Sequence, residues 1–579
     1  MPKRTKQTVQ LVPIWRFMVM ALGLLSLAIL LVWRTLNLQI LDADRGREFL
    51  QGQGNARTIR SESIPAHRGM IVDRHGEPLA VSTPVASIWA DPKELIQAMG
   101  RVPELARLLE LDSASLNKKI SSLSSRRFVY LRRHMSPAAA ERVLSASIPG
   151  VYMQREYRRY YPAGEVVSHL VGFTNIDDEG QEGLELAYND WLRGTPGSKR
   201  VLKDLYGNFV RDLDEGKPAQ PGNDLQLTID LRLQYLAYKE LKAALQRSRA
   251  KAGTLVMLDS DSGEVLAMVN QPGFNPNNRI EMKLAAMRNR AMTDMFEPGS
   301  TVKPFTVVAA LESGKFSADS VIDTNPGHIR IGSKTLVDPV NYGTLSLEQM
   351  LKKSSQVGIS KLSLALNEQW VWDVFQRIGL GRSTGTGFPG ESNGILPNHP
   401  KWLPIERANF AFGYGLSVTT LQLAQAYGVL ASGGVLRPVS LIQQGRKGGE
   451  QRVMNEEIAR SVTQMLESVI RPGGTGTRAH IDAYRVAGKT GTVHKIVDGG
   501  YADDRYLSLF VGMAPASRPR VVTVVTIDEP GSGRYYGGEA AAPVFSRVTG
   551  EAMRLLNIAP DAVDEVIADK AAKKKPGSA

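Results

Sequence analysis

A run of seventeen residues without a charge, Phe17 to Trp33, lies close to the start of the chain. As a helix it would be roughly 25 Å long, at the short end of what crosses a bilayer. Arg16 and Arg34 bracket the run, where both side chains can reach a membrane surface. A buried core helix and a cleaved signal peptide are alternatives, but the run leads into Trp33-Arg34 instead of a small-residue cleavage site. The pattern predicts one uncleaved transmembrane anchor over 17–34.

The charges around this run predict its orientation. Lys3, Arg4 and Lys6 precede it without any acidic residue, and the positive-inside rule keeps such an end in the cytoplasm. Residues 1–16 are therefore predicted to form a cytoplasmic basic tail, with the chain beyond the anchor exported. The excess of 71 Lys and Arg over 58 Asp and Glu favours anionic surroundings such as membrane surfaces. No nucleic-acid motif accompanies this excess, so we predict no nucleic-acid binding.

Length and composition indicate several globular domains. A chain of 579 residues suggests about two to four domains. The absence of cysteine excludes disulfides, thiolate nucleophiles and zinc-finger sites. Gly, Pro and charged residues cluster from Glu215 to Asp224, where we place the main boundary. We predict an N-terminal domain over 35–220, a C-terminal domain over 221–558 and a disordered basic tail over 559–579. Within the first domain, the segment from Asp91 to Ser145 is typical of short amphipathic helices.

Apolar runs predict the sheet of the C-terminal domain. Thr254–Asp259 and Glu264–Asn270 flank a turn and indicate a hairpin. Ser508–Ala514 and Val521–Ile527 form a second pair near the far end, and Val486–His494 is a further candidate strand. The helical stretches between the two pairs are 300–311, 347–366 and 419–430. Strands at both ends with helices between them predict an α+β fold, in which the two ends of the domain close one sheet.

Ser300 and Lys303 form the first chemically suggestive pair. Pro298 and Gly299 mark a helix start, which would place Ser300 in the first turn. Residues three apart share a helix face, so Lys303 can reach the Ser300 hydroxyl. A lysine kept neutral by burial can take the proton of a serine and make it a nucleophile. The spacing alone is weak, because an ordinary helix terminus gives it too, and Ser115–Lys118 and Ser248–Lys251 repeat it.

Lys489-Thr490-Gly491-Thr492 lies on a predicted strand. Alternation places Lys489 and Gly491 on one face and Thr490 and Thr492 on the other. The glycine lets a ligand or another backbone approach, and a lysine with two hydroxyls suits a carboxylate. Backbone N–H groups at this point could form half of an oxyanion hole. A solvated edge strand is the alternative.

Ser354-Ser355-Gln356 follows a predicted helix and is the third candidate. A second hydroxyl near the nucleophile can relay a proton, and a side-chain amide can hold a peptide group of the substrate. Taken alone, the segment also fits a polar boundary between a helix and a loop. The three motifs together match the serine acyl-transferase set of β-lactamases and penicillin-binding proteins.

With its longer motifs, the chain resembles the class B penicillin-binding proteins over almost its whole length, and specifically their division type (penicillin-binding protein 3 type). These are membrane-anchored peptidoglycan D,D-transpeptidases. The motifs that carry the resemblance are Pro65–Ala80, Tyr160–Gly164, Gly183–Tyr188, Glu297–Pro304, Phe412–Ser417, Gly473–Thr477, Gly488–Val493, Tyr536–Gly538 and Ala541–Phe545.

The resemblance implies a transpeptidase domain built as an antiparallel sheet flanked by helices. It further implies an elongated N-terminal pedestal or dimerisation-like domain before the transpeptidase domain. The protein would be anchored in the inner (cytoplasmic) membrane, with its catalytic domain in the periplasm. Ser300 would attack the D-Ala-D-Ala carbonyl of a stem peptide and pass the acyl group to an amine of a neighbouring strand. Lys303 would be the general base, Ser354 the proton relay and Lys489 the carboxylate anchor.

By the same resemblance, the N–H groups of Ser300 and Thr492 would form the oxyanion hole, and Thr490 and Thr492 would offer hydroxyls. β-Lactams would acylate Ser300 as substrate mimics. The expected partners are the septal glycosyltransferase and other membrane division proteins, and no metal or cofactor is implied. The alternatives are a D,D-carboxypeptidase, a β-lactamase and a weakly active division scaffold.

Gln356 departs from the family pattern, which has Asn at this position. Glutamine keeps the amide but adds a methylene, which moves that group by roughly 1.5 Å. A misplacement on this scale can cost about 10²-fold in rate. Our hypothesis is a specialised paralogue with an altered substrate or β-lactam preference.

Overall fold

The computed structural model describes residues 13–37, 59–203, 209–278, 280, 282–443, 448–497, 499–531 and 533–562. Most of the predicted tails over 1–16 and 559–579 lies outside these residues. The chain divides into two compact units, the first comprising residues 1–66 and 195–220 and the second comprising 67–194 and 221–579. The domain limits predicted from the sequence stay predictions.

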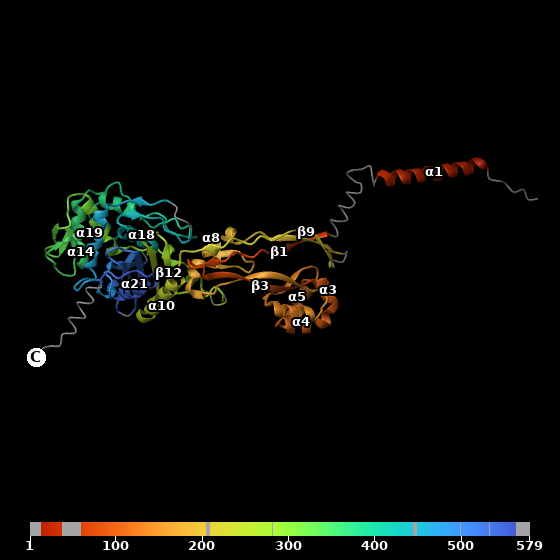
Figure 1. Cartoon of the computed structure of the whole chain (residues 1–579), viewed down its shortest axis with the longest axis horizontal. Helices are drawn as coiled ribbons and strands as arrows, with labels where there is room; N and C mark the ends of the chain where they lie inside the picture. The colour runs from red at the N-terminus through yellow and green to blue at the C-terminus, as the bar shows by residue number, and fades with distance from the viewer. Residues whose placement is uncertain are drawn as a thin grey trace, which may run out of the picture. The chain divides into compact units, whose positions relative to one another are not determined.

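The first unit contains helix α1 (Ile14–Leu36) and a small sheet (Figure 1). None of the side chains of α1 is buried. Within the described part of the chain, α1 is the one helix long and apolar enough to cross a membrane, and it contains the predicted anchor. The sheet is antiparallel with the strand order β1-β8-β9, formed by β1 (Ile59–Ile64), β8 (Gly197–Lys203) and β9 (Phe209–Lys217).

The second unit begins with a five-stranded sheet around β3 (Pro78–Ala90), which pairs along its length with β5 (Val151–Tyr160). The other strands are β2 (Ile71–Val72), β4 (Val129–Met135) and β10 (Leu225–Gln226). Short helices pack beside it on a small separate core that includes Ile88, Leu105 and Val143. They are α3 (Pro92–Leu95), η2 (Ile96–Arg101), α4 (Val102–Leu108), α5 (Ser113–Ser122) and α6 (Pro137–Ser145).

The helical prediction for 91–145 was wrong over β4. Val129, Leu131 and Met135 are buried, whereas the residues between them are only partly so. This is the alternation of a half-buried strand, and short amphipathic helices on both sides conceal it.

The sheet of the C-terminal domain has the strand order β12-β11-β21-β20-β19 and is antiparallel throughout. The predicted hairpin is β11 (Ala252–Asp259) with β12 (Val265–Gln271), and the second pair is β20 (Gly500–Ala514) with β21 (Val521–Asp528). The further candidate strand is β19 (Ala487–Val497), at the edge of the sheet. Since β11 pairs with β21, the two ends of the domain do close one sheet, and the α+β prediction is confirmed.

Helices cover both faces of this sheet. A Cβ atom on Gly253 would meet Leu241 and Leu245 of α10 (Leu231–Ser248). The next residue, Thr254, bonds to Thr420 of α18 (Thr420–Ala431). Neighbouring residues of a strand face opposite ways, so α10 and α18 lie on opposite faces. The helix α21 (Ala542–Leu555) packs beside α10.

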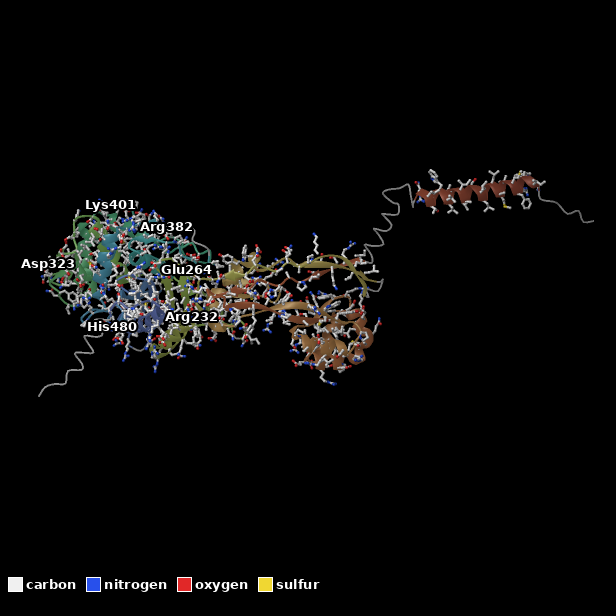
Figure 2. All side chains as sticks on the ribbon, viewed as in Figure 1. Arg232, Glu264, Asp323, Arg382, Lys401 and His480 are labelled. Carbon is white, nitrogen blue, oxygen red and sulfur yellow. The ribbon has the colours of Figure 1, made fainter. Side chains whose placement is uncertain are left out.

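The remaining elements connect these layers. The helices are η3 (Gly164–Val166), α7 (Ser168–Val171), α8 (Gly183–Ala187), α9 (Asn189–Leu192), α11 (Leu284–Met287), α12 (Arg290–Thr293), η4 (Gly299–Val302), α13 (Lys303–Glu312), α14 (Leu347–Lys353), α15 (Gln356–Ala365), α16 (Trp370–Arg377), α17 (Pro404–Ala411), α19 (Glu456–Glu467), η5 (Thr477–Ala479) and α20 (Gly537–Ala540). The strands are β6 (Phe173–Thr174), β7 (Gly180–Glu182), β13 (Val321–Asp323), β14 (His328–Ile331), β15 (Lys334–Val337), β16 (Thr344–Ser346), β17 (Val435–Leu436) and β18 (Gln451–Arg452). Charged side chains such as Arg382, Lys401 and His480 are exposed on this domain (Figure 2).

Candidate active site

Ser300 lies in the single 3₁₀ turn η4, which leads directly into α13. The predicted start of a helix at this point is therefore correct, although the α-helix proper begins only at Lys303. The Ser300 side chain is partly exposed, whereas Lys303 is completely buried. The turn thus presents the hydroxyl outward and sends the lysine into the domain.

Two contacts fix the backbone on both sides of Ser300. The N–H of Gly299 donates to the carbonyl of Gly413 at 3.0 Å. A Cβ atom on Gly413 would lie 2.2 Å from the Gly299 carbonyl oxygen, and its φ of 93° is in the left-handed region, so only glycine fits. On the other side, the buried Tyr427 hydroxyl donates to the carbonyl of Thr301 at 2.7 Å. Tyr427 was not predicted as a site residue.

The amine of Lys303 points to the third motif. Its Nζ donates to the Ser354 carbonyl oxygen at 2.5 Å and lies 3.2 Å from the Ser354 hydroxyl. The direct contact expected with the Ser300 hydroxyl is not formed, since that hydroxyl has no hydrogen bond to any residue described by the structure. Burial lowers the pKa of Lys303 to about 7, although the charge of Asp338 opposes this shift.

Ser354 lies between two buried lysines. Its backbone ends α14 in the left-handed region, at φ 57°, and its Oγ is 3.0 Å from the Nζ of Lys489. Burial, and then the charge of Lys303, hold the pKa of Lys489 well below its usual range. Two buried amines so close together resist carrying a charge at the same time. The Ser354 hydroxyl therefore lies within hydrogen-bond distance of two buried amines.

Asp338 holds the Ser354 segment in place and was missed by the sequence analysis. This carboxylate is only 3% exposed. It accepts from the Ser355 hydroxyl at 2.5 Å and from the backbone N–H of Gln356 at 2.6 Å and of Val357 at 3.3 Å. It thus stabilises the start of α15. A single aspartate after a short strand gives no sequence signal of this role.

Gln356 is the first residue of α15 and is partly buried. Its backbone is fixed by Asp338, but its side-chain amide makes no hydrogen bond within the described part of the chain. Among the residues that the structure describes, this amide therefore has no anchor.

The motif on β19 contacts the other two, through Lys489 at Ser354 and Gly491 beside Thr301. A Cβ atom on Gly491 would be 3.0 Å from the Thr301 side chain, so glycine allows β19 to pack on η4. The Thr490 hydroxyl bonds to that of Thr475 at 2.8 Å. The Thr492 hydroxyl accepts from the N–H of Gly537 at 3.0 Å, which leaves its own hydrogen free to donate. The segments 473–477 and 536–538 therefore orient the two hydroxyls.

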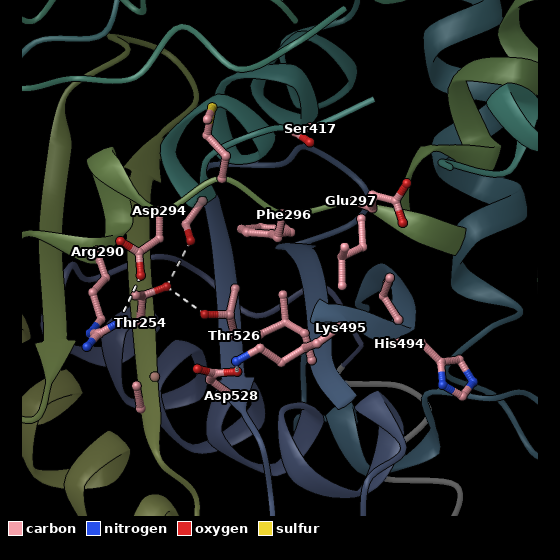
Figure 3. A pocket seen from close by; sticks show the side chains of 17 residues that line it. Thr254, Arg290, Asp294, Phe296, Glu297, Ser417, His494, Lys495, Thr526 and Asp528 are labelled. Atoms are coloured by element: carbon pink, nitrogen blue, oxygen red, sulfur yellow. Dashed lines mark hydrogen bonds and ion pairs between the residues drawn. The ribbon is translucent and has the colours of Figure 1, made fainter. Parts of the chain in front are cut away.

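A cavity of about 240 Å³ is lined by Phe296 and Glu297, which precede Ser300 in the chain (Figure 3). Thr254, Arg290, Asp294, Phe296, Lys495, Thr526 and Asp528 are among its lining residues. Four of its charges form ion pairs, Arg290 with Asp294 and Lys495 with Asp528, while Glu297 accepts hydrogen bonds from the Gly415 N–H and the Tyr501 hydroxyl. Ser300 is not part of its lining, so the cavity is separate from the three motifs.

Comparison with known proteins agrees with this geometry. Residues 253–550 match the family described as the penicillin binding protein transpeptidase domain, and residues 63–227 match the penicillin-binding protein dimerisation domain. The chain belongs to the class B penicillin-binding proteins. It is 43% identical to the peptidoglycan D,D-transpeptidase FtsI of Escherichia coli over 567 residues, covering 97% of this chain and 95% of the relative.

Two further relatives support the assignment. This penicillin-binding protein is 43% identical to the probable peptidoglycan D,D-transpeptidase PbpC of Pseudomonas aeruginosa, over 90% of this chain and 93% of the relative. Penicillin binding protein 3 of Mycobacterium tuberculosis, solved in complex with aztreonam, superposes with a TM-score of 0.68 at 29% identity, covering 86% of this chain and 98% of that chain. With α1, the similarity to FtsI indicates a single-pass protein of the inner membrane.

Proposed function

We propose that Ser300 is the nucleophile of a peptidoglycan D,D-transpeptidase that cross-links stem peptides during septal wall synthesis. The relationship to FtsI makes the chain a transpeptidase of the division type. The observation that carries the residue assignment is the position of the Ser354 hydroxyl, 3.2 Å from Lys303 and 3.0 Å from Lys489. An ordinary helix terminus does not require two buried lysines around one hydroxyl.

Acylation would begin with the loss of the Ser300 proton. Lys303 is the base, because its pKa of about 7 leaves a large neutral fraction at neutral pH. Ser300 Oγ attacks the carbonyl of the penultimate D-Ala, and the N–H groups of Ser300 and Thr492 stabilise the oxyanion. Ser354 passes a proton to the departing amine of the terminal D-Ala. An amine of a neighbouring strand then takes the acyl group and releases Ser300.

Lys489 and the threonine hydroxyls would bind the substrate carboxylate. A carboxylate beside Lys489 raises the pKa of this lysine again and restores the cation. Thr492 can donate its free hydrogen, and Thr490 is oriented by Thr475. Gln356 would bind the peptide group of the substrate through its unanchored amide. β-Lactams carry a carboxylate and a strained amide in the same arrangement, so they should acylate Ser300.

We further propose the arrangement in the membrane. The basic start of the chain lies in the cytoplasm and the catalytic domain in the periplasm. The N-terminal domain, 35–220, acts as a pedestal for the transpeptidase domain, 221–558. The partners are the septal glycosyltransferase and other membrane division proteins.

A fluorescent penicillin tests the nucleophile. The full-length protein in detergent is labelled, and the adduct is mapped by intact mass and peptide analysis. We expect one adduct on Ser300 and none in Ser300→Ala. The matched control is Ser115→Ala, since Ser115 begins another S-x-x-K match but is exposed. An adduct elsewhere, or labelling retained in Ser300→Ala, contradicts the assignment.

A product assay separates the alternatives. A stem-peptide donor and an amine acceptor give a cross-linked product with a transpeptidase, but only a shortened peptide with a D,D-carboxypeptidase. The free amide of Gln356 favours one rival, a weakly active division scaffold. That rival predicts that Ser300→Ala still complements cells that lack the other transpeptidases, whereas our proposal predicts that it fails.

A further inference from the structure

A second cavity, of about 320 Å³, lies in the second unit away from the three motifs. It is bordered by the ends of β4 and β5, by the hairpin of β6 and β7, and by the loop that follows β12. Its lining combines polar side chains with the apolar Ile176, Pro276 and Ile280 and with the ring of Tyr157. The lining includes His134, Tyr157, Arg158, Arg159, Asn175, Asp178, Asn277 and Asn278.

Three of these side chains carry a buried polar atom without a hydrogen-bond partner. The atoms are Nε2 of His134, Nη2 of Arg159 and Oδ1 of Asp178. Buried polar groups in native proteins nearly always have a partner, and an exception calls for an explanation. The Nε2 of His134 lies 3.6 Å from the Glu156 carboxylate, so the two atoms of Arg159 and Asp178 are the ones that indicate a missing partner in this cavity.

Arg159 is buried, and the protein holds its side chain in a fixed orientation. Its side chain is 1% exposed, Nε donates to Glu185 at 2.6 Å, and Nη1 donates to the Ser82 hydroxyl at 3.1 Å. These two bonds fix the guanidinium plane. Its third nitrogen, Nη2, is therefore held in position as a donor that the protein does not use.

The charges favour a neutral ligand. Glu185 is shared by Arg159 and Arg68, so these two guanidinium groups have one carboxylate between them. Asp178 lies near both: burial raises its pKa to about 6, while Arg68 and Arg159 oppose the rise. It is thus mostly ionised at neutral pH, although it forms no ion pair with a described residue. Arg158 also lines the cavity but is exposed, whereas beside the buried Arg159 an anion would be repelled by Asp178 and a cation would be repelled by the guanidinium.

A hydroxyl group satisfies both orphan atoms at once. It accepts a hydrogen bond from Arg159 Nη2 and donates one to Asp178 Oδ1. Neighbouring hydroxyls on the same ring would meet His134 and the amides of Asn175 and Asn278, and the ring of Tyr157 offers an apolar surface. We propose that this cavity binds one sugar ring of the glycan strand of the enzyme's own substrate. The proposal rests on the proposed function, because peptidoglycan is a glycan that carries peptides.

Saturation-transfer NMR on the full-length protein in detergent tests this site. The probes are β-1,4-linked oligomers of N-acetylglucosamine and glycan strands freed of peptides. We expect saturation transfer to the sugar protons and no competition by inorganic phosphate. The absence of transfer with both probes, which would leave only water in the cavity, overturns the proposal, and so does displacement by phosphate.

Substitutions locate the binding. Asp178→Ala and, as a second variant, Asn278→Ala should each weaken saccharide binding, by about tenfold for the charged acceptor. The matched control is Asp177→Ala, because Asp177 is adjacent but its side chain is 62% exposed and it pairs with Arg133. Equal affinity in all three variants overturns the site.

The same samples separate the two proposals. Labelling of Ser300 by a fluorescent penicillin should be unchanged in the cavity variants. If labelling is normal and no saccharide binds, the glycan site is wrong and the transpeptidase assignment stands. If Ser300 is not labelled in the wild-type protein, the proposed function fails, whatever binds in the cavity.

Discussion

Lys303 is the residue whose protonation state controls the proposed chemistry. Complete burial removes water from its ammonium form and lowers its pKa to about 7, while the charge of Asp338 limits the shift. The same burial acts on Lys489. Ser354 lies between them in a backbone conformation that non-glycine residues adopt at a cost. The pairing of strain with shifted pKa values is typical of functional sites.

The pH dependence of acylation follows from Lys303. A general base acts in its neutral form, so protonation below the pKa removes activity. We expect the second-order acylation rate with a fluorescent penicillin to fall about tenfold per pH unit well below pH 7 and to level off above pH 8. Stopped-flow measurements from pH 5.5 to 9 check this. A rate that does not change between pH 6 and 8 would contradict the assignment of Lys303 as the base.

Gln356 should determine the rate with simple substrates. Gln356→Asn moves the amide back by roughly 1.5 Å, and we expect a higher acylation rate with a simple penicillin, by up to about 10²-fold. Gln356→Ala serves as the comparison, since it removes the amide altogether. An acylation rate that stays the same in Gln356→Asn counts against an altered preference.

At the scale of elements, the site depends on where η4, α15 and β19 meet. Each is held by a group outside the three motifs: η4 by the segment around Gly413, α15 by Asp338, and β19 by the segment around Gly537. These contacts are short and involve backbone atoms. Even a small substitution at one of these supporting residues should therefore move the reacting groups.

Asp338→Asn tests the support of α15. The asparagine side chain has the same size as that of aspartate, but it lacks the negative charge of the carboxylate that accepts three hydrogen bonds. We expect the acylation rate to fall about tenfold or more. Because the charge of Asp338 raises the pKa of Lys303, the acid limb of the pH profile should also move to lower pH. Asp319→Asn, at an exposed position, is the control, and an acid limb that does not move would refute the electrostatic link.

Gly413→Ala tests the support of η4. Both Gly413 and Gly385 have a positive φ, but only at Gly413 would a Cβ atom meet backbone, 2.2 Å from the Gly299 carbonyl oxygen. Gly385→Ala therefore carries the conformational cost without the clash and is the matched control. We expect Gly413→Ala to reduce acylation at least about 10²-fold and Gly385→Ala to leave it nearly unchanged, measured with the same penicillin. Equal rates in the two variants would mean that the contact does not position Ser300.

At the scale of the whole molecule, buried charges connect distant parts of the second unit. Glu185 on α8 is fully buried and accepts from Arg68 and Arg159, which lie before β2 and on β5. Removing one partner from such a buried set leaves uncompensated charge in a medium of low polarity.

Glu185→Gln should therefore loosen this region. We expect a loss of about 3–5 kcal/mol in local stability, measured as faster hydrogen–deuterium exchange of the β3 and β5 amides. Glu179→Gln, at an exposed position in the β6–β7 hairpin that precedes α8, is the control. Unchanged protection of β3 and β5 in Glu185→Gln would show that the charges are compensated elsewhere.

The sequence predicted those features that depend on residues close to one another in the chain. Apolar runs predicted the strands of the sheet in the C-terminal domain, and the three motifs together with the family resemblance predicted the roles of Ser300, Lys303 and Lys489. It did not reveal Asp338 or Tyr427, because each becomes important only through contacts with residues distant in the chain. The strand β4 was missed for a similar reason, since its pairing with β3 outweighs the helical pattern around it. The orphan atoms of Arg159 and Asp178 likewise exist only in the folded protein.

The pairing of β11 with β21 has a consequence for biosynthesis. The first hairpin of the sheet in the C-terminal domain is made early, but the strand that completes it is made almost last. Until β21 is synthesised, the backbone N–H and C=O groups along one edge of β11 are unpaired. Such an edge can pair with strands of other chains and cause aggregation. A chain that ends before Val521 would therefore contain all three motifs but lack β21, the strand that joins the β12-β11 pair to the β20-β19 pair.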